Sequence, residues 1–256
     1  MKVLAIGDVV GPATIEYMQS KLRNFVSQNK ISLTLVNGEN ASIGNGVSRA
    51  DAIAILEAGA DVITSGNHVW QKKDLREFLD ESERIIRPCN YPPLSAGNGY
   101  TFFNADGYKF LVINVMGVVY GEALDDPFRT VEKILEKEKG NYDFATLDIH
   151  AETTSEKIAL ARYFDGRINI IYGTHTHVTT ADEQILPKGS GYITDLGMSG
   201  PHDSILGVKS EIIIEKLTTK MPVRFEIAEN DIRINGTLFT LDCDSGRCTN
   251  VERIVL

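Results

Sequence analysis

The sequence predicts an α/β fold in which two packed mixed β-sheets are flanked by helices. Short apolar runs alternate with segments of helical period through most of the chain, which is typical of α/β proteins. Beyond Gly191 the pattern changes to short apolar runs separated by turn residues. No repeat, low-complexity tract or linker interrupts the 256 residues. We therefore expect one domain over residues 1–256.

The first three apolar runs, VLAI, LTLV and VITS, are each followed by a segment of helical period. They predict three strand–helix units, with helices over residues 14–28, 48–57 and 72–79. Ser48 is suited to cap the second helix and Gly59 to end it. The runs YTFFN and KFLVINVMG, joined by Ala105-Asp106-Gly107, then predict a hairpin.

The alternation resumes with helices predicted over residues 130–138 and 155–164 and with the strands FATLDI and INIIY. Five further runs lie beyond Gly191, namely YITD, EIIIEKL, VRFEIA, IRING and TLFTL. Because these runs are short and separated by turns, we expect them to form strands of a second, largely antiparallel sheet.

The charge balance argues against an extended nucleic-acid surface. Lys and Arg number 26 against 35 Asp and Glu, which gives a formal net charge of -9 and opposes attraction to polyanions. A small phosphate-bearing ligand stays compatible with this charge if metal ions supply local positive charge.

No apolar run approaches the roughly 18 residues that suggest a membrane span. The first residues, MKVLAIGD, read as a strand rather than a signal peptide, so we expect a cytoplasmic protein. Three cysteines without a CxxC pair indicate neither a disulfide framework nor a thiolate metal site. We expect plain thiols, with a hairpin disulfide between Cys243 and Cys248 as the alternative.

Polar side chains of the kind that bind metals follow five of the predicted strands. In open α/β sheets these loops gather along one edge, where such folds place their ligands. The residues are Asp8, Glu39, Asn40, Asn67, His68, His150, His175 and His177. Four of the five histidines in the chain are among them.

Each of these residues also has an ordinary structural alternative. Asp8 suits a turn or a helix cap as well as a ligand position, and Asn67 suits a left-handed turn. His150 alone would be typical of a satisfied core or surface histidine. The pair His175 and His177 is more informative, because residues two apart in an extended segment face the same side and can converge on a metal cluster.

The combination points to metal binding, because turn chemistry favours Gly, Asn and Asp but gives no reason for histidine at three strand ends. Mixed nitrogen and oxygen ligands without thiolate suit manganese, iron or zinc better than magnesium or calcium. The seven candidate ligands other than His68 exceed the needs of one tetrahedral site. We therefore expect two adjacent ions that share a carboxylate bridge.

Two short motifs, GNH at residues 66–68 and GTHTH at 173–177, resemble signatures of the calcineurin-like metallophosphoesterase superfamily, and GD at 7–8 resembles its first motif. The chain more closely resembles the bacterial YmdB-type phosphodiesterase family, along nearly its whole length. The matching segments are IGDVVG, NGENAS, GADVITSGNHVW, RPCNYP, DIHAE, GTHTHV and TDLGMSGPHDSILG. Val10 stands where the superfamily has a histidine, and Gly38-Glu39-Asn40 replaces its GDxxD motif, so one metal site should hold fewer nitrogen ligands.

The family resemblance implies which residue holds which ion. Glu39 bridges the two ions. Asp8, Asn40 and His177 complete one site, and Asn67, His150 and His175 complete the other. The expected ions are iron, manganese or both, with zinc as an alternative. The resemblance also suggests a homo-oligomer.

The implied activity is hydrolysis of a phosphodiester, with 2',3'- or 3',5'-cyclic nucleotides as the expected substrate class. Two ions roughly 3.5–4 Å apart lower the pKa of a bridging water, so that it reacts as hydroxide, and neutralise the phosphoryl oxygens. His68 would protonate the leaving oxygen, since free histidine titrates near neutral pH; its alternative role is to support Asn67. Two other functions stay open: a phosphomonoesterase, such as a nucleotidase, with the same metal site, or a regulatory metal-binding partner in RNA turnover.

Other polar residues have less definite roles. Glu152 either orients a metal-bound histidine or caps the following helix. Trp70 either anchors the core or stacks on a base, and Gly44-Asn45-Gly46 is expected to form a turn. The loop LGMSGPHDSILG could touch substrate or a neighbouring subunit through Ser199, His202, Asp203 and Ser204.

Overall fold

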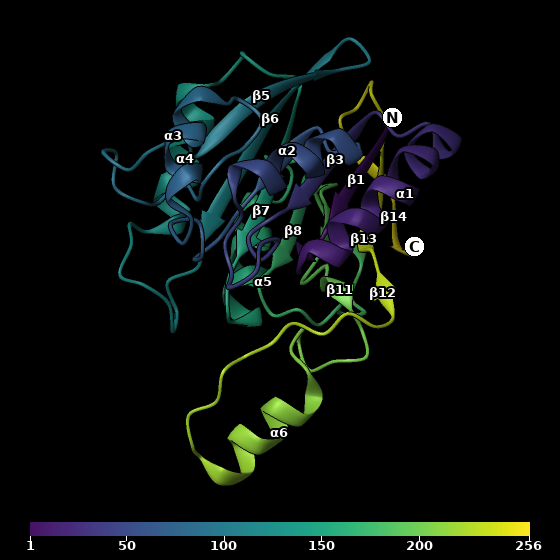
Figure 1. Cartoon of the computed structure of the whole chain (residues 1–256). Helices are drawn as coiled ribbons and strands as arrows, with labels where there is room; N and C mark the ends of the chain where they lie inside the picture. Colours follow the sequence, from purple (N-terminus) through teal and green to yellow (C-terminus); the bar gives the residue numbers. More distant parts are fainter.

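The computed structural model describes residues 1–256, and its main strands form a five-stranded and a six-stranded sheet (Figure 1). In the five-stranded sheet, three strands from the first part of the chain run parallel, and two strands from its end extend the sheet as an antiparallel pair. In spatial order these strands are β14 (Cys248–Val255), β13 (Asn235–Leu241), β1 (Lys2–Ile6), β3 (Leu33–Asn37) and β4 (Val62–Thr64).

The six-stranded sheet has four parallel central strands and an antiparallel strand at each edge. Its order is β5 (Tyr100–Ala105), β6 (Tyr108–Met116), β7 (Phe144–His150), β8 (Ile170–Thr174), β10 (Gly191–Ile193) and β9 (Gln184–Ile185). A separate small sheet consists of β2 (Asp8–Val9), β11 (Met198–Pro201) and β12 (Ile232–Arg233). The predicted hairpin is β5–β6, which turns at Asp106 and Gly107 with φ of 50° and 86°.

The two large sheets pack face to face, and each carries helices on its outer face. Along β1, Val3 and Ala5 lie in the apolar core between the sheets, while Leu4 and Ile6 lie in the core beneath the helices. One helical layer contains α1 (Pro12–Asn29), α2 (Arg49–Ala58) and α3 (Lys73–Glu81), and the other contains α4 (Pro127–Lys137) and α5 (Thr154–Phe164). Since the central strands are buried on both faces, their sequences read as continuous apolar runs.

This arrangement confirms the predicted α/β fold of two packed mixed sheets flanked by helices. The five helices predicted from the sequence are all present. Ser48 caps α2 by accepting a hydrogen bond from the Asp51 backbone N–H at 3.1 Å, and Gly59 ends that helix with φ of 122°. None of the helices combines the length and apolar character that a membrane crossing requires.

The prediction for the C-terminal part was wrong in two respects. The run EIIIEKL lies in helix α6 (Ser210–Thr219), and VRFEIA forms no strand, only an isolated bridge between Ile227 and Val208. The other strands beyond Gly191 do not form one sheet but are divided among three. β10 pairs parallel with β8 in one large sheet, β13 pairs with β1 in the other, and β12 pairs with β11 in the small sheet.

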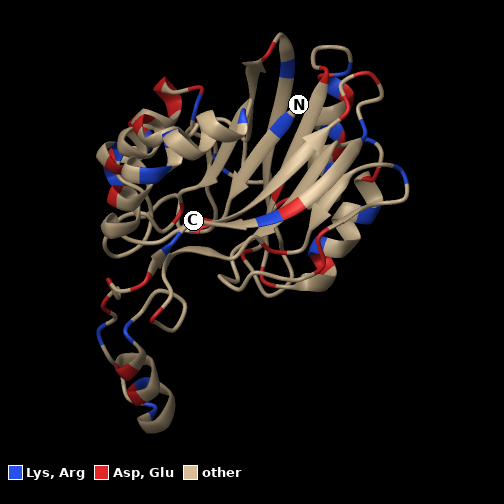
Figure 2. Cartoon of the chain, turned by 90° about the vertical axis from the view of Figure 1, so that its right-hand side faces the viewer, with Lys and Arg blue, Asp and Glu red and all other residues tan.

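The location of α6 explains the first error. Three consecutive isoleucines suggested a strand, but α6 lies on a segment that projects from the body of the molecule in both views (Figures 1 and 2). We call residues 202–230 the arm. Away from any sheet edge, the backbone groups of this segment are best satisfied within a helix.

Candidate metal centre

The structure brings the seven predicted metal ligands together at the carboxyl ends of the strands. Two groups of side chains could each hold an ion, with their donor atoms within 4.8 Å of one another. The first triad is Glu39, His150 and His175, and the second is Asp8, Glu39 and His177. Glu39 belongs to both triads, which is the position that a bridging carboxylate would occupy.

The first triad is closely packed around the imidazole of His150. Its Nε2 atom lies 3.0 Å from Glu39 Oε2, 3.0 Å from His175 Nδ1 and 3.1 Å from Asn67 Oδ1. His150 is fully buried and Glu39 is 1% exposed. A single proton on Nε2 can satisfy only part of this cluster, whereas a cation in its place could be bound by all four atoms, so the cluster has the composition of a cation site.

The second triad includes Asn40 at its edge. The Asn40 amide N–H donates to Glu39 Oε1 at 3.0 Å, and the same nitrogen lies 3.2 Å from His177 Nε2. For Asn40 to bind a metal, its amide must flip so that Oδ1 faces the centre. The fully buried Asp8 carboxylate accepts from the backbone N–H of His175 at 3.1 and 3.3 Å.

Gly66 makes room for the centre. A Cβ atom at this position would lie 2.2 Å from His150 Nε2 and 2.3 Å from Glu39 Oε2. Only glycine therefore lets the backbone that follows β4 come this close to the two side chains, which is the usual reason for glycine beside a bound group. The donor chemistry and this close approach both fit a metal centre.

A chain of buried hydrogen bonds fixes the orientation of His150. Thr174 Oγ1 donates to Asp148 Oδ1 at 2.7 Å, so it accepts from His150 Nδ1, which lies 2.9 Å away. Asp148 also accepts from Thr64 Oγ1 at 2.5 Å and from Asn37 Nδ2 at 3.1 Å. With Nδ1 engaged as a donor, Nε2 is the atom of His150 that faces the candidate centre.

Sequence reasoning missed Asp148 and Thr174. The signal was a carboxylate inside the apolar strand FATLDI, two residues before His150 and therefore on the same face of β7. A buried carboxylate in a strand needs hydrogen-bond partners, and here those partners connect it to a candidate ligand.

The segment that carries His175 and His177 is not extended, as the sequence suggested. Both residues have left-handed backbone conformations, with φ of 95° and 64°, and they join different triads. Asp195 holds the residue between them, because it accepts from the Thr176 backbone N–H at 3.3 Å and from Thr176 Oγ1 at 2.8 Å. The buried Lys157 Nζ donates to Asp195 at 2.6 Å, so a buried ion pair stabilises this strained turn.

Burial and charge shift the pKa values of the central groups. Burial opposes ionisation of Glu39, yet the charge and the hydrogen bond of His150 outweigh it and lower the pKa of Glu39 to about 2. Burial also disfavours the His150 cation, but Glu39 and Asp8 raise the pKa of His150 to about 9. Burial raises the pKa of Asp8 to about 6, and burial with the charge of His150 lowers the pKa of His175 to about 4.

His68 lies at the edge of the centre, partly exposed. Its backbone N–H donates to Glu39 Oε2 at 3.3 Å, and its Nε2 lies 3.4 Å from Asn45 Nδ2 and 3.5 Å from Asn67 Nδ2. The predicted turn at residues 44–46 is present, with left-handed φ at all three positions. Its contact with His68 through the Asn45 side chain was not predicted.

The sequence left two roles open for Glu152 and two for Trp70, and the structure favours a role at the metal centre for Glu152 and a role in the core for Trp70. Glu152 Oε2 lies 3.0 Å from His175 Nε2, while the helix that follows, α5, has no side-chain cap, so the orienting role is the one the geometry supports. Trp70 packs edge-on against Tyr91, with ring centroids 5.3 Å apart, and joins the core beneath the helices.

In the segment 196–207 after β10, three side chains make hydrogen-bond contacts within the chain, two of them to Asn235 of β13. Ser199 Oγ donates to the Asn235 carbonyl at 3.1 Å, Ser204 Oγ donates to the Pro201 carbonyl, and His202 Nε2 lies 3.0 Å from Asn235 Nδ2. Asp203 borders a small cavity at the root of the arm instead. These residues shape the loop, and none of them belongs to either triad.

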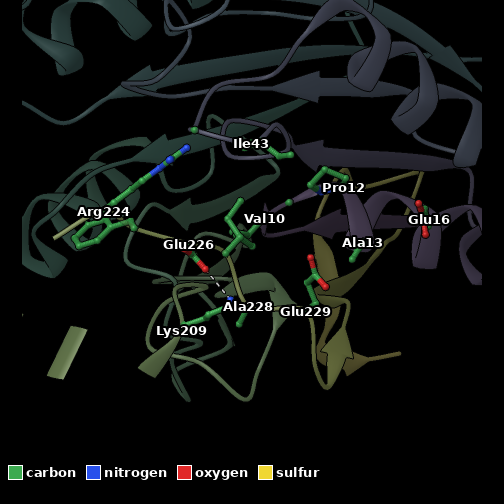
Figure 3. Close-up of a pocket in the computed structure, with 14 residues that line it drawn as sticks. Val10, Pro12, Ala13, Glu16, Ile43, Lys209, Arg224, Glu226, Ala228 and Glu229 are labelled. Atoms are coloured by element: carbon green, nitrogen blue, oxygen red, sulfur yellow. Dashed lines mark hydrogen bonds and ion pairs between the residues drawn. The ribbon is translucent and has the colours of Figure 1, made fainter. Parts of the chain in front are cut away.

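Two larger cavities adjoin these elements. One of about 340 Å³ borders the first triad, with Asn67, His150 and His175 among its lining residues. The other, of about 680 Å³, lies between the start of α1 and the arm (Figure 3), and none of the seven predicted ligands lines it. The smaller cavity is therefore the one from which a substrate would reach the candidate centre.

Comparison with known proteins gives consistent matches over the whole chain. The family model described as YmdB-like protein matches residues 4–254. The chain is 40% identical to the 2',3'-cyclic-nucleotide 2'-phosphodiesterase of Bacillus subtilis (strain 168), over 100% of this chain and 97% of that protein.

Two solved structures are also similar to the chain. One is a hypothetical protein from Thermus thermophilus, with 39% identity and a TM-score of 0.94, covering 100% of this chain and 99% of that one. The other is described as a novel phosphatase from Mycoplasma pneumoniae, with 34% identity and a TM-score of 0.93, covering 100% of this chain and 93% of that one.

Proposed function

The chain belongs to the YmdB-like protein family, and from this premise we propose that it hydrolyses 2',3'-cyclic nucleotides with the help of two metal ions held at Glu39. It is a phosphoesterase, as its similarity to a phosphodiesterase and to a phosphatase shows. The proposal of two metal ions held at Glu39 rests on the two triads, which share the buried carboxylate of this residue.

The residues divide between two ions as follows. Glu39 would bridge them; Asp8, Asn40 and His177 would hold one, and Asn67, His150 and His175 the other. When bound, iron or manganese ions supply an activated water and positive charge opposite the phosphoryl oxygens. The chain's own contribution is to fix the ligands through the Asp148–Thr174 and Lys157–Asp195 contacts.

His68 is our candidate proton donor for the leaving oxygen. It lies beside the centre, its backbone contacts Glu39, and its imidazole is not used by either triad. Proton transfer by a positioned histidine typically contributes about 10²–10⁴-fold to a rate. The competing role, support of Asn67, rests on the 3.5 Å contact between His68 Nε2 and Asn67 Nδ2, which is long for a hydrogen bond.

A phosphomonoesterase is the second candidate, because the similar Mycoplasma pneumoniae structure is described as a phosphatase. Elemental analysis of the purified protein, followed by parallel assays on 2',3'-cyclic, 3',5'-cyclic and linear nucleotides, tests both. About two ions per chain with preferred turnover of a 2',3'-cyclic substrate supports the proposal. Preference for the linear monoester would replace it, and no turnover of any phosphoester would favour a metal-binding partner protein.

We further propose that two copies of the chain associate through the arm. Helix α6 buries none of its side chains. The apolar side chains of Ile214 and Leu217, and of Met221 and Phe225 beyond the helix, are 50–64% exposed. A cluster of exposed apolar side chains on a projecting segment is typical of an interaction surface.

The cavity of about 680 Å³ at the root of the arm offers a place for the partner's arm. Figure 3 shows Val10 and Ile43 from the body on one side of it and Arg224 and Glu226 from the arm on the other. Apolar side chains with charged groups around them suit an amphipathic helix, and mutual exchange of arms gives a closed two-fold dimer.

Two smaller proposals concern the chain as a whole. Residues 1–256 would act as one metallophosphoesterase domain, because β13 and β14 from the end of the chain complete the sheet that contains β1. A cytoplasmic location is consistent with three free thiols, Cys89, Cys243 and Cys248.

A further inference from the structure

A single large aromatic ring borders the cavity beside the first triad. The walls of this cavity of about 340 Å³ come from the candidate ligands Asn67, His150 and His175 and from the segment 116–122. Tyr120 is the only Tyr, Phe or Trp among its 11 lining residues. Its side chain is 91% exposed, so nothing within the chain covers the ring.

The backbone beside Tyr120 is tied to the candidate centre. The Gly117 N–H donates to the carbonyl of His150 at 2.9 Å. The N–H groups of Val118 and Val119 donate to the two carboxylate oxygens of the buried Glu156 at 2.9 and 3.3 Å. A Cβ atom at Gly117 would lie 2.4 Å from Glu156 Oε2, so this approach needs glycine.

Tyr120 itself has an uncommon backbone conformation. Its φ of 60° is left-handed, which is unfavourable for a bulky side chain and is seen mostly where the surroundings impose it. The Gly121 N–H donates to the Val118 carbonyl at 3.3 Å and closes a turn around Tyr120. The hydrogen bonds of Gly117, Val118 and Val119 hold the segment that leads into this turn. An exposed aromatic ring at the mouth of a cavity lined by candidate ligands has the properties of a binding platform.

We propose that the nucleobase of the substrate stacks on the ring of Tyr120 while the phosphoryl group faces Asn67, His150 and His175. This inference rests on the proposed action on nucleotides. Stacking on an aromatic ring tolerates every base, because each has a π-face. Trp70, which the sequence offered for this role, is engaged by Tyr91 and the core.

Three variants of the full chain separate the ring from its backbone. Tyr120→Ala removes the ring, Tyr120→Phe keeps it, and Tyr120→Asn removes it with a residue that tolerates the left-handed conformation. The kinetic constants kcat and KM are measured for each on adenosine 2',3'-cyclic monophosphate. The same constants are measured on methyl riboside 2',3'-cyclic phosphate, which has the cyclic diester but no base.

Loss of the ring should raise KM for the adenosine substrate by about tenfold in both Tyr120→Ala and Tyr120→Asn, with kcat little changed. Tyr120→Phe should keep the wild-type KM, and none of the variants should alter KM for the base-free substrate. An unchanged KM for the adenosine substrate, or an equal rise on both substrates, would overturn the platform while leaving the proposed hydrolysis intact. If the wild-type chain hydrolyses only the base-free diester or no nucleotide, both the proposed function and the platform are wrong.

Discussion

The Nε2 atom of His150 lies 3.0 Å from Oε2 of Glu39, in a site where both side chains are buried. With the pKa of His150 raised to about 9 and that of Glu39 lowered to about 2, a proton holds the two side chains together at neutral pH. A metal ion at the same place must displace that proton, because a histidine ligand binds in its neutral form.

Metal binding at pH 7.5 should therefore release one proton from His150, in addition to any proton released by a metal-bound water. His175, whose pKa is lowered to about 4, is already neutral at this pH and should release none. The contribution of His150 should vanish well above pH 9, and metal affinity should fall as the pH drops below 9. Calorimetric titration of chelated protein with Mn²⁺ in two buffers of different ionisation enthalpy measures the proton count. Equal heats in the two buffers at pH 7.5 would contradict this protonation state.

Glu39→Gln should lower phosphodiesterase activity by more than about 100-fold. Loss of a residue that only supports a metal ligand typically costs up to about 100-fold, and Glu39 is proposed to be a ligand itself. The amide keeps the size of the side chain but loses the negative charge that would hold two cations together. Circular dichroism should show a folded chain, and elemental analysis should show less metal. Glu152→Gln is the matched control, because Glu152 is 58% exposed, its one side-chain hydrogen bond is to His175 Nε2, and glutamine keeps an oxygen that can accept from this atom, so both ions should stay bound. Near wild-type activity of Glu39→Gln with full metal content would exclude the bridging role.

Leu217→Glu should dissociate the proposed dimer, since it places a charge among the exposed apolar side chains of the arm. Light scattering on the eluting protein gives the mass of each species. Leu94→Glu serves as the control, because Leu94 is fully exposed and lies outside the arm, so this change should leave the mass unaltered. A monomeric wild type, or a dimer that survives Leu217→Glu, would show that the arm does not join two copies.

The sequence predicted the parts of the structure that depend on local pattern. Strands buried on both faces read as apolar runs, and their ends could be recognised because polar side chains follow them, as His150 follows FATLDI. Glu39 and His150 are 111 residues apart and follow strands of different sheets, so the sequence predicted that each lies at the carboxyl end of its strand, but their contact depends on how the two sheets pack together.

Other features depend on contacts that no local pattern reveals. Lys157 and Asp195 form an ion pair although they are 38 residues apart, and no motif beside either residue predicts this contact. The left-handed turn at His175 and His177 depends on this pair through Thr176, so an extended segment was the natural expectation. The isoleucine run of α6 was predicted to be a strand from its local preference. It forms a helix instead, because no sheet edge lies beside it with which a strand could pair.

Manganese or iron should restore activity to the chelated protein more readily than magnesium or calcium. Three of the candidate ligands are imidazoles, which suit these transition metals, whereas magnesium and calcium prefer shells of oxygen. Activity and bound metal are measured together after reconstitution with each ion. Equal activation by calcium would argue against His150, His175 and His177 as direct ligands.

Asn67 and His68 are adjacent, yet the proposed mechanism gives them different tasks, so their variants should fail in different ways. Asn67 Oδ1 lies 3.1 Å from His150 Nε2, inside the cluster, whereas the imidazole of His68 lies at its edge. Asn67→Ala should therefore lower the metal content. His68→Ala should keep both ions and lose nucleotide turnover by about 10²–10⁴-fold if proton transfer limits the rate.

The dependence on the leaving group separates proton donation from any other role of His68. Nitrophenolate leaves without protonation, whereas a nucleoside alkoxide needs a proton as the bond breaks. His68→Ala should therefore reduce hydrolysis of a cyclic nucleotide far more than hydrolysis of bis-p-nitrophenyl phosphate. Asn45→Ala is a useful companion, because it removes the 3.4 Å contact to His68 Nε2 and should cause a smaller loss with the same dependence on the leaving group. If His68→Ala slowed both substrates equally, or lost a metal ion, His68 would support the metal centre and another group would donate the proton.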